Sequence, residues 1–390
     1  MKPGLPAGVV ALGLVSLFTD MSSEMIHALL PLYLTGTLGA SALMLGLIEG
    51  AGEAVAQVTK LFSGYFSDKW GRRKPLAVLG YGLSALTKPL FALAGSPGLV
   101  LGARVADRVG KGIRGTPRDA MVADMVPPDR RGAAYGLRQS LDTVGAFVGP
   151  LLAIVFMILL AGDVRLVFAL AIVPALIAVA ILVAFVREPA ENSAVRRRVG
   201  LNRASLARLG GGVRRAIAIG AVLTLARISE AFLILRAGEV GLGLTWVPLV
   251  LVAMNLVYSA AAWPVGVVSD RMGRRGLLGL GFAVLILADL VLGFGQGVAV
   301  FFVGVALWGL HMGLTQGVLA AMVADAAPAD QRGTAFGLFN LVTGAALLVG
   351  NAAAGACWTV WGAEATFVAA AGVAAFALVA GMIWSGRTTL

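Results

Sequence analysis

The chain has 390 residues, of which 59% are hydrophobic and only 13% are charged, and its mean hydropathy is +0.90. Soluble globular proteins carry about 25% charged residues, so this composition excludes a protein that folds in water. A formal net charge of +11 is compatible with a nucleic-acid partner, but the positions of the basic residues, described below, indicate a different role. The composition predicts an all-α polytopic membrane protein.

Apolar segments long enough to cross a bilayer, which takes roughly 20 helical residues, recur from one end of the chain to the other. The first contains Asp20 and Glu24 and lacks a small-residue cleavage site, so we interpret it as a helix and not as a removable signal. In chain order, the twelve predicted transmembrane helices span 8–35, 43–66, 76–96, 99–124, 133–160, 164–186, 214–237, 244–268, 276–296, 299–325, 333–356 and 360–384.

The short connections between these helices alternate in charge. Segments 37–41, 96–98 and 293–296 contain no Lys or Arg, whereas the intervening connections are basic. The positive-inside rule therefore places the basic loops and both termini in the cytoplasm, and we expect the cytoplasmic (inner) membrane of a bacterium. Because this placement accounts for the positive net charge, we expect no nucleic-acid partner.

The two halves of the chain repeat. "GYFSDKWGRRKPL" at residue 64 recurs as "GVVSDRMGRRGLL" at 266, and "MVADMVPPDRRGAAYGL" at 121 recurs as "MVADAAPADQRGTAFGL" at 322, offsets of 202 and 201 residues. An even number of predicted helices separates the copies, so both have the same membrane orientation and the repeat is parallel. The predicted parts are two six-helix bundles, 1–190 and 214–390, and an Arg-rich cytoplasmic linker, 191–213.

The motif at residue 64 resembles the signature of the loop between helices 2 and 3 in the major facilitator superfamily, Gly-x-Leu-Ala-Asp-x-x-Gly-Arg-Arg/Lys. Phe66 and Ser67 replace its Leu-Ala. The resemblance implies the twelve-helix fold of that family and a cytoplasmic gate, in which the aspartate contacts a helix N-terminus of the other half and the arginines complete a charge relay. The expected gate residues are Gly64, Asp68, Gly71, Arg72 and Arg73, with Asp270, Arg274 and Arg275 in the second copy.

Ionisable residues at bilayer depth are costly and usually face a cavity. Asp20, Glu24 and His27 lie on one face of the first predicted helix, at i, i+4 and i+7. In the seventh helix, Glu230 follows a serine as Glu24 does, and Arg227 is nearby. These side chains are candidates for proton coupling or substrate contact, and ion pairing within the protein is the alternative.

Two further helices contribute candidates. The second helix carries Glu49 and Glu53 one turn apart. The fourth contains Arg108-x-x-Lys111-Gly112, which resembles the Arg-x-x-Gln-Gly motif of proton-coupled members of the superfamily, with lysine in place of glutamine. The aligned residues of the tenth helix are uncharged, so this basic stripe either neutralises acids of helices 1 and 5 or contacts an anionic solute. The candidate residues of helix 4 are Arg104, Asp107, Arg108 and Lys111.

In the fifth helix, Arg138 and Asp142 stand at i, i+4, which allows either an ion pair or a role in transport. Gly145, Gly149 and Pro150 resemble the Gly-x-x-x-Gly-Pro motif associated with antiporters, without its final Gly-Gly. We interpret them as a packing motif, because small residues allow close helix contact. Trp308 and His311 are candidates for an aromatic wall or an interfacial anchor in the second half.

These patterns favour a secondary transporter that works by alternating access and exports a small solute in exchange for protons. An importer or uniporter of an anionic metabolite, and a divalent metal exporter using the acids of helix 1, are the alternatives. We found no catalytic triad, nucleotide loop or metal-binding cluster in the sequence. We therefore expect no enzyme activity, no catalytic residue, no bound cofactor or resident metal, and a monomer.

Overall fold

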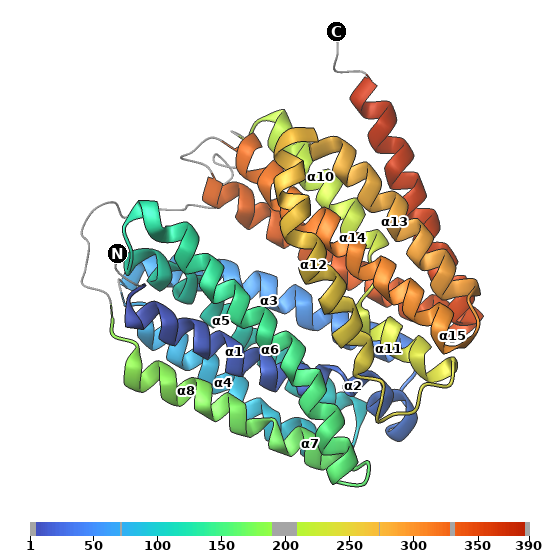
Figure 1. Cartoon of the computed structure of the whole chain (residues 1–390), viewed down its shortest axis with the longest axis horizontal. Helices are drawn as coiled ribbons and strands as arrows, with labels where there is room; N and C mark the ends of the chain where they lie inside the picture. Colours follow the sequence, from blue (N-terminus) through green and yellow to red (C-terminus); the bar gives the residue numbers. More distant parts are fainter. Residues whose placement is uncertain (1–4, 71, 189–208, 273, 328–331, 387–390) are drawn as a thin grey trace. The chain divides into compact units, whose positions relative to one another are not determined.

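The computed structural model describes residues 5–70, 72–188, 209–272, 274–327 and 332–386. Within these residues it contains helices and connecting turns, and no β-strand. The helices, shown in Figure 1, are α1 (Ala7–His27), α2 (Leu30–Leu32), η1 (Tyr33–Thr37), α3 (Ala42–Trp70), α4 (Lys74–Leu93), α5 (Pro97–Asp124), η2 (Pro128–Arg130), α6 (Arg131–Leu159), α7 (Val164–Leu170), α8 (Ile172–Phe185), α10 (Gly211–Ala226), α11 (Glu230–Glu239), α12 (Leu249–Met272), α13 (Arg274–Phe294), α14 (Gly297–Ala326) and α15 (Arg332–Gly386).

Each of the twelve predicted segments is mostly helical where the structure describes it. Among the described residues, eight helical spans are long and apolar enough to cross a membrane. The predicted all-α membrane fold is confirmed. Interruptions divide some segments: α10 and α11 are separate helices within one predicted span, and Gly362 breaks α15 with a φ of 83°. Positive φ is strained for residues with a Cβ atom, so glycine suits this break.

Local signals explain several helix boundaries. Ser96 caps α5 by accepting a hydrogen bond from the backbone N of Leu99, and Pro97 follows as the first helical residue. Asp163 caps α7 by accepting bonds from two backbone amides, 2.9 and 3.1 Å away. Such caps satisfy amides that have no partner within the helix.

The contacts divide the chain into two compact units. Unit 1 comprises Met1–Tyr33 and Val55–Arg198, and unit 2 comprises Leu34–Ala54 and Val199–Leu390. The first half of α3 thus groups with unit 2, which the predicted boundary at residue 190 did not foresee. Residues 191–208 of the predicted linker lie outside the described residues.

Helices within each unit pack along long interfaces (Figure 1). In unit 1, α1 packs against α6 and α8, and α4 packs against α5 and α8. In unit 2, α13 packs against α14 and α15, and α12 packs against α14. The α4–α5 and α13–α14 pairs come from equivalent parts of the sequence repeat, at an offset of 201 residues.

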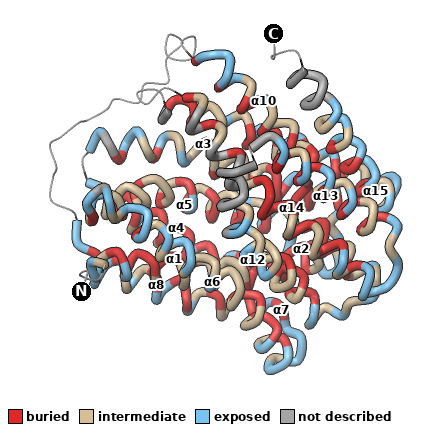
Figure 2. The backbone as a smooth tube through the Cα atoms, turned by 45° about the horizontal axis from the view of Figure 1, so that its top comes forward, coloured by how far each residue is buried: buried red, intermediate tan, exposed pale blue. Residues whose placement is uncertain are grey.

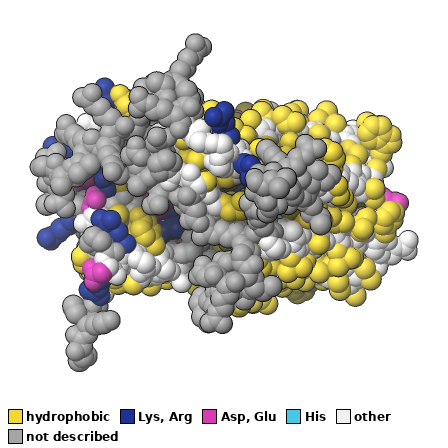
Figure 3. All heavy atoms as spheres, turned by 90° about the horizontal axis from the view of Figure 1, so that it is seen from above, with side chains coloured by type: hydrophobic (Ala, Val, Ile, Leu, Met, Phe, Trp, Pro, Cys, Tyr) yellow, Lys and Arg dark blue, Asp and Glu magenta, His cyan; other side chains and the backbone are white. Residues whose placement is uncertain are grey.

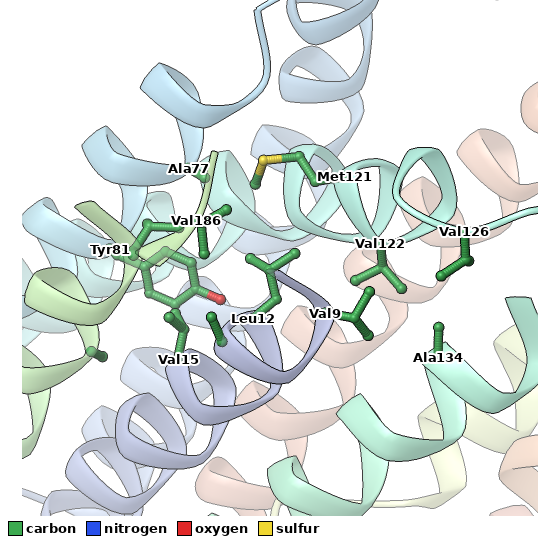
Figure 4. Packing of buried hydrophobic residues seen from close by; sticks show 13 residues of the cluster. Val9, Leu12, Val15, Ala77, Tyr81, Met121, Val122, Val126, Ala134 and Val186 are labelled. Carbon is green, nitrogen blue, oxygen red and sulfur yellow. The ribbon is translucent and has the colours of Figure 1, made fainter. Parts of the chain in front are cut away.

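The core of unit 1 contains an apolar cluster that joins α1, α4, α5 and α6. Leu12 and Val15 from α1 meet Tyr81 from α4 and Val122 from α5 (Figure 4). Burial follows the inward-facing sides of the helices, while many outward-facing residues are exposed (Figure 2).

Large apolar side chains cover much of the outer surface. In the face shown in Figure 3, hydrophobic side chains form broad areas, and the visible Lys and Arg side chains occur in a few small groups. Leu93 and Phe376 are 78% and 72% exposed. Such a surface would cause association in water, but it suits contact with lipid chains.

Candidate functional site

A buried ion pair joins α4 to α5. The ammonium Nζ of Lys88 lies 3.0 Å from Oδ1 of Asp107, and both residues are at least 95% buried. Lys88 also donates a hydrogen bond of 3.2 Å to the hydroxyl of Ser23 on α1, and Thr87 donates one of 3.4 Å to the Asp107 carboxylate. Three helices therefore share one polar network inside unit 1.

The same helix pair holds a buried arginine. Arg114 donates a hydrogen bond of 2.6 Å to the hydroxyl of Ser84, and its guanidinium lies 4.7 Å from the ring centroid of Tyr81. This approach is possible because α4 and α5 meet at Gly80 and Gly110. A Cβ on Gly80 would lie 2.7 Å from the carbonyl oxygen of Gly110, so the backbones touch where both side chains are absent.

The predicted acidic face of α1 lies near this basic helix. Nδ1 of His27 is 3.5 Å from Oε2 of Glu24, and both residues are partly buried. Lys111 of α5 is exposed and within electrostatic range of both Asp20 and Glu24. Arg108 and Arg104, about one and two turns before Lys111, are buried. Among the described residues, no three His, Cys, Asp or Glu side chains are grouped so that they could hold a metal ion.

A second group of charges lies toward the end of α5 and the start of α6. Arg118 and Asp119 form an ion pair of 2.9 Å, and Arg138 lies 3.8 Å from the same carboxylate. The predicted i, i+4 contact between Arg138 and Asp142 is present at 3.7 Å. Asp142 is also within electrostatic range of Asp20, which links this group to the acids of α1.

The glycines of α6 lie against α1. A Cβ on Gly149 would lie 2.6 Å from the carbonyl oxygen of Met21, and one on Gly145 would collide with that of Leu17. Pro150 is buried within the continuous helix α6. The two glycines therefore bring α6 close to the turns of α1 that precede and follow Asp20.

Part of the predicted gate is described. Arg73 forms an ion pair of 2.5 Å with Asp124 at the end of α5. The carboxylate of Glu188 accepts hydrogen bonds of 2.6 and 2.9 Å from the backbone amides of Arg73 and Lys74, at the start of α4. Gly64 packs against Thr116 of α5, and Arg72 is exposed.

For five predicted gate residues, the structure does not describe the side chain or the residue itself. Gly71 lies outside the described residues, and so do the side chains of Asp68, Asp270, Arg274 and Arg275. The contact of Asp68 with the other half and the second copy of the gate stay predictions.

In unit 2, the predicted candidates lie in different surroundings. Glu49 is 2% exposed and Glu53 is partly buried. Arg227 and Glu230 flank the break between α10 and α11, so Glu230 is the first residue of α11. Asn351 of α15 stabilises this break by accepting a hydrogen bond of 2.7 Å from the backbone amide of Ser229.

Sequence reasoning missed Lys88, the cation that pairs with Asp107. A detectable signal existed: Lys88 is a lone base in the middle of an apolar helix, where a charge needs a partner. The expected roles of Trp308 and His311 were wrong for this structure. Both are 0% exposed, because Gly281 and Gly304 allow α13 and α14 to pack closely around them, and they neither anchor at an interface nor line an open wall.

The fold defines a class of multi-pass helical membrane proteins built from two repeated halves, with a buried ion pair inside one of them. The family model for the Major Facilitator Superfamily matches residues 12–250 and 217–389. The chain belongs to the Major Facilitator Superfamily, and its general activity is secondary transport across a membrane.

Two relatives and one solved structure illustrate this membership. An uncharacterized MFS-type transporter of Methanocaldococcus jannaschii is 32% identical over 375 residues, which cover 93% of this chain and 91% of the relative. The multidrug resistance protein MdtH of Yersinia pestis is 33% identical over 115 residues, 30% of this chain and 28% of MdtH. The crystal structure of the nucleoside transporter NupG matches with a TM-score of 0.78, covering 96% of this chain and 98% of NupG, at 12% identity. That likeness shows the fold alone.

Proposed function

We propose that the protein is a proton-coupled exporter that moves a small solute out of a bacterial cell across the cytoplasmic membrane. The observation that carries this proposal is the position of Asp20 and Glu24, within electrostatic range of the exposed Lys111. The partial similarity to a multidrug resistance protein supports export. We further propose that the protein acts as a monomer with both termini in the cytoplasm.

In the proposed mechanism, the proton and the solute compete for Asp20 and Glu24. When Asp20 and Glu24 are ionised, Lys111 offsets only part of their negative charge, and the site can accept a cationic or polar solute. Protonation removes the negative charge and weakens the attraction to that solute. A proton and a solute would therefore occupy the site alternately, while residues 1–190 rock against 214–390 in the alternating-access cycle.

The exposure of Lys111 also favours a second candidate, an importer or uniporter of an anionic solute. Arg114 and Lys88 are engaged by Ser84 and Asp107, whereas Lys111 is exposed and could bind a carboxylate or a phosphate ester. In this case Asp20 and Glu24 would hold Lys111 in place, and transport would need no proton exchange.

The test is the dissipation of a preset pH gradient in everted vesicles, with lipophilic cations, organic anions and divalent metals added in turn. We expect one solute class to release protons in the wild type and not in Glu24→Gln. Asp129→Asn, a change at an exposed loop acid, serves as the matched control and should behave as the wild type. Solute counterflow without proton release in all three proteins would reject antiport and favour the uniporter.

A further inference from the structure

The repeat places an acid in unit 2 where unit 1 has the buried lysine. At the offset of 201 residues, Lys88 aligns with Asp289 and Asp107 aligns with Trp308. The structure supports this register, because Gly80 packs against Arg114 and the aligned Gly281 packs against the aligned Thr315. Asp289 therefore occupies the α13 position that corresponds to one half of the α4–α5 ion pair.

Asp289 has no partner in its buried position. It is 0% exposed, and neither carboxyl oxygen has a hydrogen-bond partner in the described structure. No charged side chain of the described residues forms an ion pair with it. A carboxylate in such surroundings is strongly disfavoured, because neither water nor a counter-charge replaces its hydration.

The described charged groups of the neighbouring elements are bonded to other partners, are exposed, or lie nearer to His311. Arg236 of α11 donates hydrogen bonds to the carbonyl oxygens of Leu292 and Gly293 at the end of α13, and it pairs with Glu239 at 3.0 Å. Glu364 of α15 is exposed. On α14, His311 is the titratable group with a described side chain, and Arg227 is within its electrostatic range.

Two further buried polar atoms lie in the same helix pair without partners. They are Nε2 of His311 and Nε1 of Trp308. Nδ1 of His311 lies 2.9 Å from the carbonyl oxygen of Gly281, so in the neutral ring Nδ1 carries the hydrogen and Nε2 is an acceptor. Among the described side chains of α13 and α14, the polar atoms of Asp289, Nε2 of His311 and Nε1 of Trp308 are therefore buried without hydrogen-bond partners.

We propose that Asp289 is a proton-binding site inside unit 2, distinct from the acids of α1. Uptake of one proton from water forms an O–H bond on the carboxylate and leaves a neutral acid, which the apolar packing between α13 and α14 accommodates. When the helix pair admits water, the proton returns to solvent and the carboxylate is hydrated. The claim that this exchange contributes to transport rests on the proposed proton coupling, whereas the binding site itself does not.

The first test is infrared difference spectroscopy of the purified full-length protein as pH is raised. A protonated carboxyl group has a carbonyl-stretch band separate from the amide bands, and this band shifts on exchange into heavy water. We expect a band in the wild type that is lost at alkaline pH and is absent from Asp289→Asn. Glu364→Gln, which removes an exposed acid from the same unit, should retain it. Asp289→Glu keeps the carboxyl group and should move the band, which identifies it even if the asparagine variant fails to fold.

The second test is proton release during transport in reconstituted vesicles. We expect Asp289→Asn to lose proton release while solute counterflow continues. A band that is absent, or that does not change with pH, would overturn the binding site. A titrating band with unchanged coupling in Asp289→Asn would overturn its role in transport. If the wild type itself releases no protons, the proposed antiport fails, and the infrared titration still decides whether Asp289 binds a proton.

Discussion

The helix pairs α4–α5 and α13–α14 derive from the same repeated segment but differ in whether a buried ionisable side chain has a partner of opposite charge. In unit 1, Lys88 and Asp107 neutralise each other, and Arg114 is held by Ser84. In unit 2, Asp289 stands alone opposite neutral residues. The same arrangement of two packed helices accommodates an ion pair in unit 1 and an acid without a partner in unit 2. The charges of unit 1 are therefore not required by the fold.

The largest effect should come from removing the acid of the unit 1 pair. In Asp107→Asn, Lys88 and the neighbouring arginines keep their charges in a buried site without an anion. Removing one partner of a buried ion pair costs about 3–5 kcal/mol, so we expect a loss of that size in the free energy of unfolding. Denaturant titration followed by tryptophan fluorescence measures it.

The double variant Lys88→Met with Asp107→Leu is the informative partner of that experiment. It removes both partners of the ion pair together, so neither is left buried without the other, and it should be more stable than Asp107→Asn. Equal destabilisation in the two variants would show that the pair does not act as a unit.

In unit 2, removing the buried acid Asp289 should raise the free energy of unfolding, whereas removing Asp107 in unit 1 should lower it. Asp289→Leu replaces a buried acid without a partner by an apolar side chain that has the same branching and the same number of non-hydrogen atoms. Replacing buried charged groups by apolar ones is often neutral or stabilising by about 1–4 kcal/mol. We expect a higher unfolding midpoint together with loss of the infrared band. A clear loss of stability would indicate that Asp289 makes a stabilising contact, which would contradict the conclusion that it has no partner in unit 2.

Close approach of the helices also differs between the pairs. In Gly80→Ala, the new methyl group would lie 2.7 Å from backbone atoms of Gly110 and Arg114, which cannot move independently. In Gly281→Ala, it would meet side-chain atoms of Thr315 and the Cβ of Leu314 at 3.4 Å. Overpacking costs typically about 1–3 kcal/mol, and we expect that loss for Gly80→Ala.

The loss in Gly281→Ala should be smaller, because the nearest contact is a side-chain methyl group of Thr315 and not the backbone of the facing helix. Thermal unfolding of both variants, measured side by side, tests the difference. A larger shift for Gly281→Ala would contradict it.

The sequence predicted the fold well because each span carries its own apolar signal and the repeat fixes the orientation of the halves. The acidic face of α1 was also predictable, since i, i+4 and i+7 spacing puts Asp20, Glu24 and His27 together. Lys88 and Asp289 were missed because their importance depends on the helix opposite them. Helical periodicity describes one helix at a time, whereas pairing of Lys88 and isolation of Asp289 are properties of two packed helices.

The smallest effect should come from Tyr81, which aligns with Phe282 at the offset of 201 residues. Its hydroxyl is buried without a hydrogen-bond partner, while its ring lies beneath the guanidinium of Arg114. Tyr81→Phe keeps the ring and removes an unsatisfied polar group, so the free energy of unfolding should change by less than about 0.5 kcal/mol, or rise. Tyr81→Ala, which also removes the ring, should cost about 3–5 kcal/mol. A large loss in Tyr81→Phe would mean that the hydroxyl binds a group in unit 1 that phenylalanine never needs in unit 2.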